Sequence, residues 1–130
     1  MEKNRPALRN PWMLLAALLM ALTVNVHVFA GGPEIMQPVR ASDLAPLPGA
    51  VVHVIWHFVT LLLALMAAAL VFLWRMSNPP LAVLLIGINL GTALIFLAYG
   101  VALLGTVWPM PQWIIFLAVA ALITLGLRRA

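Results

Sequence analysis

The sequence contains no cysteine and very few charged residues. The absence of cysteine excludes disulfide bonds, thiolate metal sites and thiol–disulfide exchange. Charged residues make up only 8% of the 130 residues, whereas hydrophobic residues make up 65%. A soluble domain of this length cannot bury so many apolar side chains. The composition therefore predicts a protein that is surrounded by lipid, with the bilayer as its principal partner.

Acidic residues are scarcer than basic ones, at three against seven, which gives a net charge of +4. Such an excess is typical of proteins that bind nucleic acid, but here the basic residues stand at the ends of apolar segments instead of on one face. They are Lys3, Arg5, Arg9, Arg40, Arg75, Arg128 and Arg129. This distribution excludes nucleic acid as a partner and indicates signals for membrane topology.

Prolines divide the chain into four apolar segments, because proline inside a helix removes a hydrogen bond and clashes with the preceding turn. We expect helices at about 11–30, 50–74, 79–104 and 110–127, with a long outer loop at 31–49. Asn10-Pro11 and Asn78-Pro79 each combine a capping side chain with proline at the first helical position. The predicted fold is an all-α membrane protein, in which residues 1–130 form a single transmembrane domain, an antiparallel bundle of four transmembrane helices.

The basic residues also predict an orientation. With both termini in the cytoplasm, six of the seven lie inside and only Arg40 lies on the far side of a bacterial inner membrane. One alternative remains for the N-terminus, since a basic start, an apolar core and Val28-Phe29-Ala30 together have the shape of a cleaved secretory signal. The mature chain would then begin at Gly31, and the other three helices would keep the same orientation.

Small and polar residues form one stripe on each of the first two predicted helices, at the spacing of a helix face. The first stripe contains Ala16, Met20, Thr23, His27 and Ala30, and the second contains His53, His57, Thr60, Ala64 and Ala67. Such stripes are typical of the sides on which membrane helices pack, so we expect them to face one another. On the third helix, Gly87 and Gly91 favour close contact with a further helix, which a partner membrane protein or a second copy of the chain would also supply.

The three histidines are the strongest candidates for a functional site. If the stripes face one another, His27, His53 and His57 converge near the outer face as a ligand set for zinc, copper or nickel, or for the iron of haem b. Glu34 would add a ligand, and Tyr99 of the third helix would lie at a similar depth beside His27 and His57. The spacing of His53 and His57 lacks the intervening glutamate of a metalloprotease motif, and no catalytic residue is predicted.

Two other interpretations stay open. The histidines can be structural, fastening helix ends by hydrogen bonds in a structural or accessory subunit. They can also line a pocket for a quinone, a lipid or another small ligand. Ionisable side chains at membrane depth are costly, which is why each one is a hypothesis about function.

The run HVFAGGPE at 27–34, followed by WHFVT at 56–60, resembles an uncharacterised group of small bacterial four-span integral membrane proteins. The resemblance covers most of the chain and implies the topology, but no activity. Small multidrug exporters are similar in size, yet they carry a buried acidic residue in the first helix, which this chain lacks. Histidine pairs at both membrane faces, as in diheme cytochromes of the b561 type, are also missing from this sequence, so only a single haem between the first two helices would be compatible with it.

Overall fold

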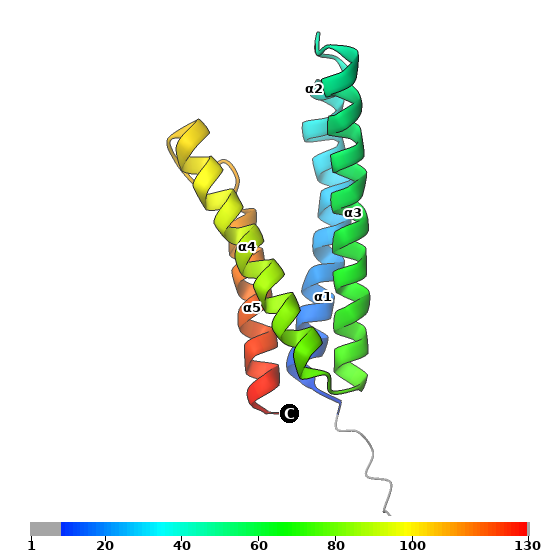
Figure 1. Ribbon diagram of the computed structural model, residues 1–130, viewed down its shortest axis with the longest axis vertical. Coiled ribbons are helices and arrows are strands. Elements are labelled where there is room, and N and C mark those ends of the chain that lie inside the picture. The colour runs from blue at the N-terminus through cyan, green and yellow to red at the C-terminus, as the bar shows by residue number, and fades with distance from the viewer. Residues whose placement is uncertain (1–8, 130) are drawn as a thin grey trace, which may run out of the picture.

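The computed structural model describes residues 9–129, and the regular structure of this range is entirely helical (Figure 1). The elements are α1 (Pro11–Asn25), η1 (Val26–Ala30), η2 (Gly32–Met36), α2 (Gln37–Arg40), α3 (Pro46–Arg75), α4 (Pro79–Leu104) and α5 (Gln112–Arg128). The first four elements follow one another as one helical rod, Pro11–Arg40. The described chain is thus an antiparallel arrangement of four helices, which confirms the predicted fold class. Pro11–Arg40, α3 and α4 are long and apolar enough to cross a membrane, and α5 is a shorter apolar helix.

The long outer loop predicted at 31–49 is wrong, because the chain stays helical as far as Arg40 and only residues 41–45 connect it to α3. The wide turns of η1 and η2 explain how proline is tolerated. The backbone N–H of Gly31 donates to the carbonyl of Val26, and that of Gln37 donates to Gly32, each five residues back. Pro33 has no backbone N–H and cannot make the usual hydrogen bond to the carbonyl four residues back. We attribute the wide turns on either side of it to this missing donor.

Local signals at the helix ends are confirmed. The side-chain oxygen of Asn10 accepts hydrogen bonds from the backbone N–H groups of Trp12 at 3.2 Å and Met13 at 3.4 Å. The side-chain oxygen of Asn78 accepts one from Leu81 at 3.1 Å. The helix α4 occupies the range predicted for the third helix and ends on Gly105, whose positive φ of 70° forms a left-handed cap.

The four helices form two arms (Figure 1). The first arm consists of the rod Pro11–Arg40 and α3, and the second arm consists of α4 and α5. The arms meet where α1 packs on α5, and they diverge towards the opposite end, so that α3 barely touches α4. The buried core is shared by all four helices and includes Met13, Ala16, Met20, Leu63, Met66, Leu70, Ala82, Leu85, Phe116, Val119 and Ile123.

The predicted stripe is buried in part on α1, where Ala30 at its end is exposed, and it is wrong for α3. On α1, Ala16, Met20 and Thr23 are buried as expected. On α3, the buried residues are large, namely Leu63, Met66, Leu70 and Leu73, whereas His57 and Ala64 of the predicted stripe are exposed. The large buried side chains of α3 belong to the same core as the small ones of α1, so α3 does not supply a second small face.

The helix ends that carry most of the positive charge gather at one end of the molecule, which we call the basic end. There the backbone N–H of Asn10 donates to the carbonyl of Trp74 at 3.2 Å, and its side-chain amide donates to the carbonyl of Gly126 at 2.9 Å. The guanidinium carbons of Arg9 and Arg75 lie 5.2 Å and 5.4 Å from the ring centre of Trp74, so both cations contact its ring. Arg128 is the last residue of α5, and the guanidinium carbon of Arg129 lies 5.2 Å from the ring centre of Trp12. The connection 41–45 marks the opposite far end, next to Arg40, while Lys3 and Arg5 lie outside the described residues.

Candidate functional site

His27 lies flat against Trp56 and joins the rod to α3. The ring centres are 4.0 Å apart and the ring planes meet at 20°. The imidazole Nε2 is also 3.4 Å from the backbone oxygen of Trp56, to which it donates when it carries the proton. The same oxygen accepts a hydrogen bond from the hydroxyl of Thr60 at 3.0 Å. His27 therefore holds both the ring and the backbone of Trp56.

Gly31, four residues after His27, completes the place where Trp56 packs. A β-carbon on Gly31 would lie 2.9 Å from the Cη2 atom of the Trp56 ring. The glycine thus allows the indole to approach the wide turn of the rod closely. Sequence reasoning treated Trp56 only as a residue near the membrane surface. The sequence signal that could have predicted this contact is the pair of His27 and Gly31, four residues apart on one face of the helix.

His53 fastens the end of α2 to the first turns of α3. Its Nδ1 is 2.8 Å from the carbonyl oxygen of Gly49, and its Nε2 is 3.4 Å from Nε of Arg40. A guanidinium group only donates, so Nε2 accepts and Nδ1 carries the proton that is donated to Gly49. Both ring nitrogens of His53 are thus engaged within the chain, and neither has a lone pair free for a metal ion.

The predicted ligand set is not brought together. Within residues 9–129, no three His, Asp or Glu side chains are placed to hold a metal ion. Trp56 faces the rod, and since successive helical residues are about 100° apart, its neighbour His57 turns away from His27. Glu34 is exposed on η2, and Tyr99 is exposed on α4 in the other arm. Binding of a metal or of haem b by His27, His53, His57, Glu34 or Tyr99 stays a prediction.

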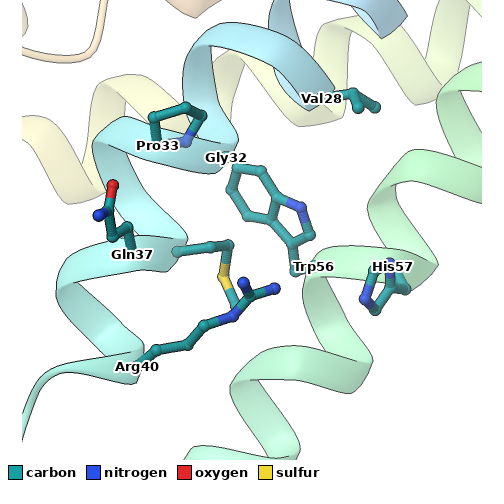
Figure 2. Close-up of a pocket in the computed structure, with 8 residues that line it drawn as sticks. Val28, Gly32, Pro33, Gln37, Arg40, Trp56 and His57 are labelled. Atoms are coloured by element: carbon teal, nitrogen blue, oxygen red, sulfur yellow. The ribbon is translucent and has the colours of Figure 1, made fainter.

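A groove of about 460 Å³ lies between the rod and α3 at the far end (Figure 2). Its lining residues are Val28, Gly32, Pro33, Met36, Gln37, Arg40, Trp56 and His57. Figure 2 shows the guanidinium of Arg40 beside Trp56, with His57 on the next position of α3. The groove therefore combines one cation and two neutral polar side chains with an apolar wall, and none of its eight lining residues is acidic.

Comparisons with protein-family models, with curated proteins and with solved structures found no significant match to this chain. The resemblance of HVFAGGPE and WHFVT to the group of small bacterial membrane proteins accordingly stays a prediction.

Proposed function

We propose that this chain is a structural or accessory subunit of a bacterial inner membrane, which it crosses four times with both ends in the cytoplasm. The basic end carries Arg9, Arg75, Arg128 and Arg129, and such residues favour the cytoplasmic side. The helix α5 has 17 residues and is about 25 Å long, close to the ~30 Å thickness of the hydrocarbon layer. Trp113 at its start then lies near the outer interface.

The observation that carries the accessory role is the use of two histidines as fasteners. His27 stacks on Trp56 and His53 bonds both Gly49 and Arg40, so that each links the rod to α3. Hydrogen bonds and a ring stack of this kind contribute about 1 kcal/mol each to stability. The interpretation in which the histidines fasten helix ends is therefore better supported than the one in which they bind a metal or haem.

The length of α3 indicates a role for the far end of the first arm. The helix α3 has 30 residues and is about 45 Å long, which exceeds the ~30 Å hydrocarbon layer. If Trp74 marks the inner interface, the outer boundary on α3 falls about 20 residues earlier, near Ile55. On the antiparallel rod, the outer boundary falls about 20 residues after Trp12, near Gly32. The far end of the first arm then extends beyond the lipid as a helical hairpin, in which a hydrogen bond from Arg40 to His53 joins the two helices. A hairpin of this kind is suited to contact a partner protein outside the membrane.

Elemental analysis and a visible absorption spectrum test this proposal on protein purified without a histidine tag. We expect no stoichiometric metal and no Soret band, and we expect His27→Ala and His53→Ala to lower thermal stability while insertion into the membrane is retained. Stoichiometric metal or haem that is lost in His27→Ala would overturn the accessory role in favour of a ligand site.

A further inference from the structure

The groove at the far end lies where lipid headgroups are expected. Gly32 and Trp56 lie near the expected boundary of the hydrocarbon layer, and both line the groove. Arg40 is about two turns further out, but helical side chains lean towards the N-terminus of their helix, which here points back to the membrane. His57 on the antiparallel α3 leans the opposite way, away from the membrane. Polar side chains from two helices thus line the groove near the boundary.

The polar part of the groove is suited to an anion. Arg40 uses its Nε–H for His53, which leaves the donors of its terminal nitrogens free for a phosphate. His57 supplies a further donor at the rim, whereas the amide of Gln37 points away from Arg40 (Figure 2). Between Arg9 and Arg75 the sequence has no other lysine or arginine than Arg40. The one cation of the far end is therefore in the groove, although the distribution of basic residues disfavours it on this side of the membrane.

The apolar part indicates that the anion carries a hydrocarbon chain. Val28, Pro33, Met36 and the ring of Trp56 form a wall that a free phosphate ion would leave in contact with water. The volume of about 460 Å³ is within the ~300–1,000 Å³ of ligand pockets and suits a headgroup with the first part of its chain. None of the lining residues is acidic, so the groove itself offers no carboxylate to the positive charge of a zwitterionic headgroup; Glu34 is exposed on η2 and is not among the lining residues.

We propose that this groove binds one anionic phospholipid of the leaflet at the far end, with its phosphate on Arg40 and its first methylene groups on the wall that contains Trp56. The proposal goes beyond the accessory role and does not depend on it, because it requires only that the first arm crosses the bilayer. It also holds for either orientation of the chain.

Protection of a single thiol from chemical labelling tests the proposal. Because the sequence has no cysteine, an introduced cysteine is the only thiol that reacts. Gln37→Cys places a single thiol at the rim of the groove, and Ser42→Cys places a matched control in the exposed connection 41–45. The full chain, freed of lipid in a neutral detergent, is mixed with phosphatidylglycerol, phosphatidylcholine or inorganic phosphate. The rate of reaction with a water-soluble maleimide is then measured for each thiol.

We expect phosphatidylglycerol at about ten times its dissociation constant to slow the reaction at Gln37→Cys about tenfold, because only the unoccupied fraction reacts, and to leave Ser42→Cys unchanged. Adding Arg40→Gln should abolish the protection, and adding Arg40→Lys should restore part of it. Equal protection by phosphatidylcholine would show occupancy without selection for charge. Equal protection by inorganic phosphate would show a site for a free anion, and no protection would show no binding; each of these three results overturns the proposal.

Discussion

Gly126 of α5 faces Met13 of α1 so closely that a β-carbon on the glycine would lie 2.8 Å from the methionine Cε. The same β-carbon would be 3.3 Å from Oδ1 of Asn10, which caps α1. We expect Gly126→Ala to lower the free energy of unfolding by at most about 1 kcal/mol, because the flexible end of Met13 can move aside and alanine favours the helix. Thermal unfolding in detergent, followed by circular dichroism, measures the change.

The matched control is Gly91→Ala on α4, where a β-carbon would meet nothing within 4 Å. We expect this change to be neutral or to stabilise by up to about 1 kcal/mol, since alanine favours the helix. Equal losses at Gly126 and Gly91 would contradict the assigned contact. A loss at Gly91 alone would indicate that a second chain packs on Gly87 and Gly91.

Asn10 combines two roles that substitution can separate. Asn10→Asp keeps an oxygen that accepts from Trp12 and Met13, but it loses the amide that donates to the carbonyl of Gly126. We expect a cost of about 1 kcal/mol for Asn10→Asp, and about 1–3 kcal/mol for Asn10→Ala, which also removes the cap. Unfolding in mixed micelles of increasing denaturing detergent compares the two variants. Wild-type stability in Asn10→Asp would mean that the bond to Gly126 contributes nothing.

The unequal faces of α1 and α3 predict different responses to the same substitution. Ala16 is fully buried, so Ala16→Leu should destabilise the bundle by about 1–3 kcal/mol through overpacking. Ala64 belonged to the face predicted from the sequence but is exposed, and Ala64→Leu should therefore be nearly neutral in lipid. Thermal unfolding of the pair decides the matter: a larger loss in Ala64→Leu would restore the predicted face.

At His27, a ring can be kept while its hydrogen bond is removed. His27→Phe retains an aromatic face against Trp56 but cannot bond the backbone oxygen of that residue. We expect a loss of about 1 kcal/mol for His27→Phe and about 1–3 kcal/mol for His27→Ala, which also removes the stack. Melting temperatures of the two variants measure the difference. If His27→Phe is as damaging as His27→Ala, stacking on Trp56 has no part in fastening the rod.

Asn89 is fully buried in α4, and the structure gives its side-chain oxygen no hydrogen-bond partner. Its amide nitrogen donates at 2.8 Å to the carbonyl of Leu85 in the same helix. Because Leu has nearly the same branched shape without the unpaired oxygen, Asn89→Leu should be neutral or stabilising by up to about 1 kcal/mol. Equilibrium unfolding in detergent measures this. A clear loss of stability would instead show that the oxygen binds a water molecule or a partner chain.

What the sequence predicted well is local. The caps at Asn10 and Asn78 and the full range of α4 depend on neighbouring residues, and so does the buried stripe through Ala16 and Met20. The helical path through Pro33 was missed because proline was taken as a boundary, whereas wide turns accommodate it.

The candidate site was harder to predict because it depends on which face of α3 meets the rod. A shift of one residue along that helix, from Trp56 to His57, moves the contact by about 100° and separates histidines that the pattern placed together. The divergence of the two arms, which leaves Tyr99 in the second arm, likewise depends on contacts between distant segments.

The bond from Asn10 to Gly126 also sets an order of events during synthesis. The two residues are 116 positions apart, so the acceptor does not yet exist while the ribosome is still making α3 and α4. The rod and α3 are therefore complete before the Asn10 amide can meet its acceptor. Closure of the basic end is then a late step of synthesis, and until α5 has been made the side of α1 that packs on it is uncovered.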